Sequence, residues 1–183
     1  MTEGSSSGTG APADASAYLV REPRPEDVEG FAGLHVRVWR ETYRGVMDDE
    51  TVEALSVDDF RPQWYVLTRA YAEGTIPGDG RAVRVALLGD EPAGFLMVGP
   101  ARDQDAPAPW QVYSLNVAPE HQGSGIAQRL MDEVLRPGPA YLWVAGANAR
   151  AIRFFERNGF VLDGTQTVGQ HEGMVEARMV RPA

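Results

Sequence analysis

The sequence predicts a single α/β domain: a mixed, mostly antiparallel central sheet of six to seven strands, with helices on both faces. Its 183 residues, 43% of them hydrophobic, suit one domain with a sizeable core. Short apolar runs with strand character are interspersed with amphipathic helical stretches. Between residues 110 and 145 a strand, a glycine-rich turn, a helix and another strand follow one another, which predicts one parallel pair joined by a crossover.

The first third of the chain reads as a tail, a strand and helices. Residues 1–16 are mostly Gly, Ser, Ala and Pro, so we expect a disordered tail that leaves 17–183 as the domain. Residues 17–22 form a short apolar run typical of a strand. Apolar residues recur every three or four positions across 24–43, which predicts an amphipathic helix. Two short helices are expected within 48–74, the second beginning near Asp58 or Asp59.

The remaining two thirds contain most of the predicted sheet. Strands are indicated by apolar or alternating runs bounded by turn residues, and helices by capping residues followed by apolar residues at helical spacing. The expected strands are 81–88, 93–99, 110–117, 140–146, 159–168 and 173–180. The expected helices are 125–135 and 148–158, the second capped by Asn148 and ended by Gly159.

Composition excludes several classes of function. Without cysteine the chain has no disulfide, thiolate metal site or cysteine nucleophile, and only three histidines argue against a dedicated metal site. The net charge is -9 and every basic residue is arginine, which argues against binding nucleic acid. No apolar run approaches the roughly 20 residues of a membrane span, and no secretory signal is visible. We expect a cytoplasmic protein, monomeric or homodimeric.

Acidic residues concentrate in one segment. Residues 22–59 hold eleven acids and four arginines, a charge of 4 minus 11, or -7. Such a segment would attract a cationic substrate, although acidity also serves solubility.

Residues 119–130, "PEHQGSGIAQRL", place two glycines before a helix. If the helix begins near Gly123, the amides from Gly123 to Ala127 have no intrahelical acceptor and can bind an anion, helped by the helix dipole. The two glycines can equally form an ordinary turn before a helix, with no bound anion. A dinucleotide-binding motif would need a third glycine where Gln128 stands, and a P-loop would need a lysine.

Two segments together resemble a known family. "LNVAPEHQGSGIAQRLMDEVL" resembles the signature of the GNAT superfamily of acyl-CoA-dependent N-acetyltransferases, with Gln122, Gly125 and Ala127 at its defining positions. "LWVAGANARAIRFFERNGFVLDG" resembles the family's second segment. The residues in register there are Asn148, Ala151, Phe155, Gly159 and Phe160. The two matches cover roughly residues 110–164.

The resemblance implies acetyl-CoA as co-substrate and no metal. Amides of the 122–127 turn would bind the pyrophosphate, and the pantetheine arm would lie in a slot where the strand ending at Val117 splays from strand 140–145. The amide of Leu115 or Asn116 would polarise the thioester carbonyl. The implied cofactor-binding residues are Asn116, Val117, Gln122, Gly123, Ser124, Gly125, Ile126, Ala127, Asn148 and Phe155.

One position departs from the family pattern. The tyrosine that protonates the departing thiolate in many members is Phe155 here, which has no proton to give. Strand alternation places Tyr113 on the face of Leu115, toward the reacting carbonyl, so Tyr113 and Ser114 are the candidate catalytic hydroxyls. Water could serve instead of either.

The acceptor is expected to be a primary amine of a small cationic molecule, such as a polyamine or an aminoglycoside-like antibiotic. Its candidate contacts are Tyr43, Glu41, Trp110 and His171, with Glu41 also able to end a proton-carrying water chain. His171 could equally be a solvated turn residue. Two alternatives stay open: acetylation of a protein N-terminus or lysine, and a coenzyme A sensor without turnover.

Overall fold

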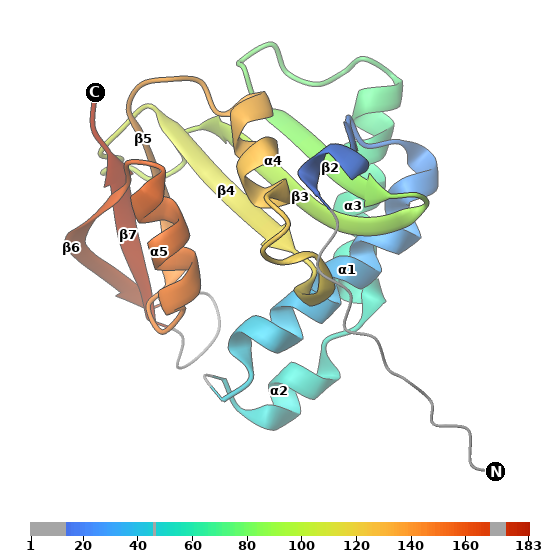
Figure 1. The fold of residues 1–183 in the computed structure, drawn as a ribbon, viewed down its shortest axis with the longest axis horizontal. Helices are drawn as coiled ribbons and strands as arrows, with labels where there is room; N and C mark the ends of the chain where they lie inside the picture. The colour runs from blue at the N-terminus through green and yellow to red at the C-terminus, as the bar shows by residue number, and fades with distance from the viewer. Residues whose placement is uncertain (1–13, 46, 169–174) are drawn as a thin grey trace.

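The computed structural model describes residues 14–45, 47–168 and 175–183 (Figure 1). Its helices are α1 (Val28–Tyr43), α2 (Asp49–Ala54), α3 (Val57–Ala72), α4 (Ile126–Val134) and α5 (Ala149–Arg157). Its strands are β1 (Leu19–Arg21), β2 (Ala82–Leu88), β3 (Glu91–Pro100), β4 (Trp110–Val117), β5 (Ala140–Ala145), β6 (Val161–Val168) and β7 (Val175–Arg181). Short 3-10 turns are η1 (Ala15–Ala17), η2 (Pro25–Asp27) and η3 (Pro119–His121).

The seven strands form one mixed sheet in the order β1-β2-β3-β4-β5-β7-β6. Every neighbouring pair is antiparallel except β4 and β5, which run parallel and are joined through α4. The predicted fold class is confirmed.

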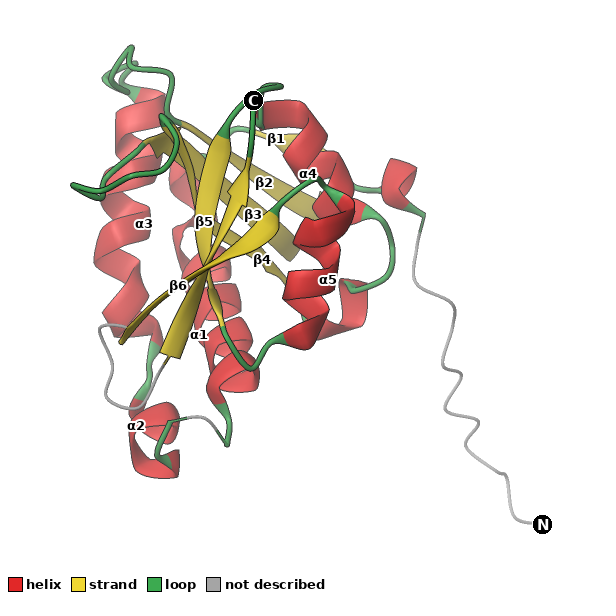
Figure 2. Ribbon diagram, turned by 90° about the vertical axis from the view of Figure 1, so that its left-hand side faces the viewer, coloured by secondary structure: helices red, strands yellow, loops and turns green. Residues whose placement is uncertain are grey.

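Helices cover both faces of the sheet. Figure 2 shows α1 and α3 on one side and α4 and α5 on the other. Successive side chains of a strand point to opposite faces, so the sheet carries two apolar cores. Phe31, Trp64 and Phe95 centre the core under α1 and α3. Leu130, Leu142 and Phe160 centre the core under α4 and α5.

The N-terminal boundary differs from the expected one. Of the residues predicted to belong to the tail, Ala15 and Ser16 begin η1, and Asp14 caps it because its carboxylate accepts a hydrogen bond from the Ser16 amide. The Arg129 guanidinium then donates to the carbonyls of Ala15 and Tyr18, at 2.8 Å each. These contacts fix the segment against α4.

The second helix of the 48–74 region lies close to its expected span. It begins at Val57, because Ser56 and Asp59 form a capping box in which the Asp59 carboxylate accepts from the Ser56 amide at 2.7 Å. It then continues for 16 residues.

A β-bulge interrupts β4. Ser114 lies opposite Met97 and Val112 lies opposite Val98, so Tyr113 is the extra residue. Val112 and Leu115 both pack in the core under α4 and α5, whereas Tyr113 packs in the other core. The prediction that Tyr113 shares a face with Leu115 is therefore wrong, because strict alternation does not hold across a bulge.

A buried ion pair joins β1 to the turn before α1. The Arg21 guanidinium donates to both carboxylate oxygens of Asp27, at 2.6 and 2.8 Å, and the Arg24 amide donates to the same carboxylate at 2.7 Å. The Asp27 side chain is only 5% exposed. Removing it leaves a buried guanidinium without its partner.

We therefore predict that Asp27→Ala lowers the free energy of unfolding by about 3 kcal/mol, measured by urea denaturation. Glu29→Ala is the matched control, because the Glu29 ion pair with Arg61 lies in solvent and contributes far less. Equal effects of the two substitutions would contradict the assigned role of Asp27.

Candidate active site

The parallel pair β4 and β5 separates before either strand ends. Trp110, Gln111 and Val112 pair with residues 140–142, and the pairing stops there. The separation begins at the bulge, and it leaves residues 113–117 without a sheet partner on the β5 side. A cavity of about 780 Å³ occupies this region, lined by residues of α1, α3, β3, β4, β5, α4, α5 and β7. The splay implied by the family resemblance is confirmed, and it connects the two sides of the sheet.

The glycine turn lies at one end of this cavity. Gly123 and Gly125 both have φ near +85°, a backbone conformation that glycine adopts without strain. After these two left-handed residues α4 begins at Ile126, one residue later than the expected helix 125–135 and three residues later than the start near Gly123 that was considered for the free amides.

The turn leaves fewer amides free than the sequence suggested. Three backbone amides of the turn already have acceptors. That of Gln122 donates to the Pro119 carbonyl, that of Ser124 to the His121 carbonyl, and that of Ile126 to the Ser124 hydroxyl oxygen. In the described part of the chain, those of Gly123, Gly125 and Ala127 have no acceptor. All three residues line the cavity, at the positive end of the nine-residue helix α4. The arrangement suits a phosphate group.

Three further predicted cofactor residues hold the surrounding backbone in place. The Gln122 side-chain amide donates to the Val117 carbonyl at 3.2 Å, which ties the turn to the end of β4. The Asn148 side chain accepts from the Ala151 amide at 3.0 Å, so its predicted capping of α5 is confirmed. Phe155 is buried against Phe154 and Phe160 and also lines the cavity.

The end of β4 presents different residues to the two faces. Leu115 packs under α4 and α5. Ser114 and Asn116 lie opposite Met97 and Phe95, whose side chains belong to the core under α1 and α3. The side-chain amide of Asn116 donates to the Ser114 hydroxyl oxygen at 2.6 Å, and both residues line the cavity. The α1 and α3 side therefore contains a neutral polar pair beside the slot.

Tyr113 does not point toward the expected reaction centre. Its hydroxyl donates to the Pro100 carbonyl at 2.6 Å, and the Arg102 guanidinium stacks on its ring, 3.4 Å from the centroid. Gly99 lies under the same ring, where any Cβ would collide with it. The bulge thus makes Tyr113 part of the cavity wall, with its hydroxyl proton already donated.

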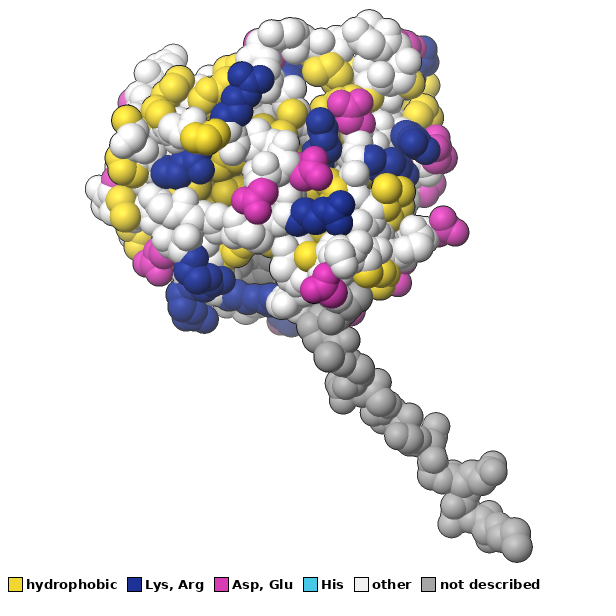
Figure 3. All heavy atoms as spheres, turned by 45° about the horizontal axis from the view of Figure 1, so that its top comes forward, with side chains coloured by type: hydrophobic (Ala, Val, Ile, Leu, Met, Phe, Trp, Pro, Cys, Tyr) yellow, Lys and Arg dark blue, Asp and Glu magenta, His cyan; other side chains and the backbone are white. Residues whose placement is uncertain are grey.

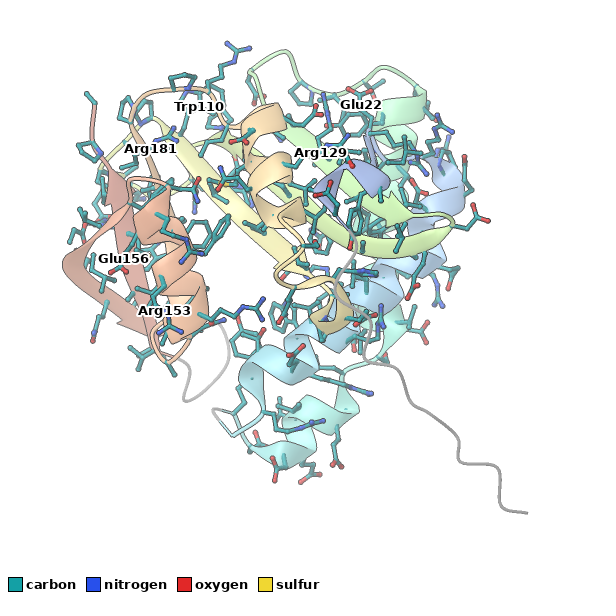
Figure 4. The ribbon with its side chains drawn as sticks, in the orientation of Figure 1. Glu22, Trp110, Arg129, Arg153, Glu156 and Arg181 are labelled. Carbon is teal, nitrogen blue, oxygen red and sulfur yellow. The ribbon has the colours of Figure 1, made fainter. Side chains whose placement is uncertain are left out.

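The predicted acceptor residues fall in different places. Tyr43 lines the cavity. Glu41 does not line the cavity and is exposed. It stands two positions before Tyr43 on α1, and that spacing places the two side chains on opposite sides of the helix. Trp110 lies at the start of β4 with its ring against Gly80, far from the strand end at the slot (Figure 4). His171 lies outside the described residues.

Sequence reasoning missed several residues of the cavity wall. His35, Trp39 and Thr42 share one face of α1 with Tyr43, and their helical spacing could have grouped them. Glu176 carried no such signal. It enters the site because β7 pairs with β5, which places it opposite Ala145 at the end of that strand. Burial and, to a lesser extent, the charge of Glu176 raise the pKa of Tyr43 to about 12.

His35 is a buried histidine in the cavity wall. Its ring stacks on Phe60, with centroids 4.1 Å apart, and also contacts Phe95 and Trp39. Its Nδ1 atom is buried and has no hydrogen-bond partner among the described residues. Burial lowers the pKa of His35 to about 4, so the ring is neutral at neutral pH.

Charges outside the cavity are mixed in sign. On the face shown in Figure 3, acidic and basic side chains are interspersed. Within the described ranges, Glu91, Glu120 and His121 come close enough to hold a metal ion, but Glu120 already pairs with Arg37 at 2.8 Å and His121 with the Tyr18 hydroxyl at 3.1 Å. None of the described helices is both long and apolar enough to cross a membrane.

Comparison with known proteins identifies the class. The acetyltransferase (GNAT) family matches residues 39–160, more than half of the chain. The protein therefore belongs to this family and is an acyl-CoA-dependent N-acetyltransferase.

Individual relatives agree with this assignment. A probable N-acetyltransferase of Mycobacterium tuberculosis is 30% identical over 152 residues, covering 81% of this chain and 83% of the relative. The crystal structure of PaiA N-acetyltransferase from Thermoplasma acidophilum with coenzyme A superposes with a TM-score of 0.67, at 17% identity, covering 91% and 99% of the two chains. The crystal structure of a ribosomal-protein-alanine N-acetyltransferase from Brucella melitensis superposes with a TM-score of 0.64, at 21% identity, and the match covers 90% of this chain and 99% of that one. These two structures share the fold.

The depressed pKa of His35 predicts a pH dependence of stability. Unfolding exposes the ring and restores an ordinary pKa near 6.5, so the unfolded state takes up the proton first as the pH falls. The native state should therefore lose about 3 kcal/mol of stability between pH 6.5 and pH 4 through this group alone. The His35→Phe variant should lack this loss in denaturation curves at pH 7 and pH 4. A native-state NMR titration with a midpoint near 6.5 would contradict the assignment.

Proposed function

We propose that the protein transfers the acetyl group of acetyl-CoA to a primary amine of a small cationic molecule, by direct attack in a ternary complex. The observation that carries the proposal is the single cavity that joins the glycine turn, the β4–β5 slot and the α1 and α3 side. Two substrates entering from opposite faces of the sheet would meet beside Leu115 and Asn116.

The cofactor is assigned to the α4 and α5 side. The amides of Gly123, Gly125 and Ala127 would bind the pyrophosphate, assisted by the α4 dipole. Arg150 and Arg157 of α5 also line the cavity and supply positive charge. The bound coenzyme A in the Thermoplasma structure, which shares this fold, supports the choice of ligand.

The acceptor is assigned to the α1 and α3 side. Glu176 is the acid that lines the described cavity, and it lies beside Tyr43 at the end of β5. Its carboxylate would hold the acceptor ammonium and receive its proton through water. The acetyl carbonyl would accept a hydrogen bond from the amide of Leu115 or Asn116 as charge develops on its oxygen.

The reaction forms one C–N bond and breaks one C–S bond. The neutral amine attacks the thioester carbonyl, the tetrahedral adduct collapses, and the sulfur leaves with the bonding electrons. Phe155 has no proton to donate to that sulfur. The Ser114 hydroxyl, which accepts from Asn116 and keeps its own proton for donation, or water would supply it.

The phosphate assignment predicts a charge effect at Gly123. A Cβ at Gly123 meets no atom within 4 Å, and Asn and Asp are nearly isosteric residues that tolerate its positive φ. Gly123→Asp should bind coenzyme A about 100-fold more weakly than Gly123→Asn in calorimetry, because the carboxylate repels the pyrophosphate. Equal affinities of the two variants would remove the turn from the cofactor site.

The assignment of Glu176 predicts a loss of turnover with amines. Glu176→Gln should lower kcat/KM for the amine about 100-fold, measured by thiol release, while the affinity for acetyl-CoA stays the same. Glu41→Gln, on the solvent side of α1, should have no such effect. The reverse result would place the proton acceptor at Glu41.

A further inference from the structure

The wall of the acceptor side is aromatic and apolar along α1. His35, Trp39 and Tyr43 follow one another on one helix face, with ring centroids 6.0 Å apart for the first pair and 5.0 Å for the second. Val38 lies on the same lining, and Met97 contributes a thioether from β3. Aromatic faces and a thioether favour contact with a flat apolar group over a hydrated, multiply charged one.

This wall has a polar group at each end. Tyr43 lies beside Glu176, next to the slot. His35 lies eight residues earlier on α1, about 12 Å along the helix axis. The Nδ1 atom of His35 is buried and has no hydrogen-bond partner among the described residues, and the residue, which is only 5% exposed, lines the cavity. A buried polar atom without a partner costs free energy, and a molecule bound in the cavity that His35 lines would supply the imidazole with a partner.

The charge inventory of the cavity does not suit a polycation. Glu176 is its carboxylate, and Arg102 stacks on Tyr113 in the same wall. Many acids of the 22–59 segment are occupied by structural roles. Asp27 pairs with Arg21, Glu29 and Asp58 pair with Arg61, and Asp48 and Asp59 cap helices. A second ammonium in the cavity would meet Arg102 and no further described acid of the lining.

From this arrangement we infer that the acceptor is an aromatic monoamine with a hydrogen-bonding group at the end far from its amine. The ammonium binds at Glu176, the aromatic body lies on Trp39, and the distal group pairs with the imidazole of His35. A phenol hydroxyl suits that position, because it can donate to one tautomer of a neutral imidazole and accept from the other. The inference rests on the proposed function and narrows its substrate class.

The first experiment compares acceptors on the intact protein by thiol release from acetyl-CoA. The probes are tyramine, phenethylamine and spermidine, with a short peptide bearing a free N-terminus. We expect kcat/KM for tyramine to exceed that for phenethylamine about tenfold, since the two differ only in the distal hydroxyl. Both should exceed spermidine.

The second experiment tests His35 through a ratio and not through activity alone. In His35→Phe, which keeps an aromatic ring against Phe60, the tyramine-to-phenethylamine ratio should fall to about one. His35→Gln, which restores a polar nitrogen, should recover part of the ratio. A ratio that His35→Phe leaves unchanged overturns the role of His35, and the wild-type panel decides the class even if the variant fails to fold.

The outcomes separate this inference from the proposed function. Preference for spermidine leaves acetylation of small cationic amines standing and overturns the aromatic monoamine. Preference for the peptide overturns both. Calorimetric binding of acetyl-CoA without thiol release from any probe also overturns both and favours a coenzyme A sensor.

Discussion

The parting of β4 from β5 at Tyr113 is the feature on which the rest of the site depends. One extra residue opposite Met97 and Val98 bends β4 away from its parallel neighbour after only three paired positions. The freed backbone of 113–117 then borders a slot through the sheet. Without that slot the two helical layers would enclose two separate cores, and groups on opposite faces could not meet.

The same bulge decides which side chain serves which face. It moves Tyr113 to the α1 and α3 side and fixes its hydroxyl on the Pro100 carbonyl, while Leu115 stays on the α4 and α5 side. Gly99 has to be a glycine because the displaced tyrosine ring lies over its Cα. Ser114 and Asn116, beyond the bulge, then lie on the α1 and α3 side, where the acceptor is proposed to bind. Segments distant in sequence support the cofactor end in a similar way, since Arg129 holds the backbone of Ala15 and Tyr18 beside the glycine turn.

Local sequence signals predicted what local physics determines. Hydrophobic periodicity located α1, the hairpin of β2 and β3 was visible from its turn, and Asn148 was identified as a cap from its position before α5. The two glycines marked the turn before α4, where the anion site is proposed, and their left-handed conformations place the helix start at Ile126. The bulge could not be predicted, because it depends on how β3 and β4 pair. Glu176 was invisible for the same reason: only the pairing of β7 with β5 brings it to the slot.

The acidic segment shows why net charge alone does not define the acceptor. Eleven acids between residues 22 and 59 suggested a cationic acceptor, yet several of those carboxylates cap helices or pair with arginines. What faces the cavity is decided by helix rotation, which exposes Glu41 and turns Tyr43 inward.

Phe155 is consistent with a reaction in which protonation of the leaving group is the easier proton transfer. A thiol has a pKa near 8.5, so a departing thiolate is already close to stable in neutral water, and a dedicated acid adds little. An alkylammonium has a pKa near 10.4 and must lose a proton before it can attack, so the harder transfer lies on the amine side. In the proposed mechanism, the absence of a hydroxyl at Phe155 is therefore tolerable, whereas loss of the carboxylate at Glu176 would not be. The proposed chemistry thus depends more on β7 and α1, outside the two signature segments, than on the position where the family pattern is broken.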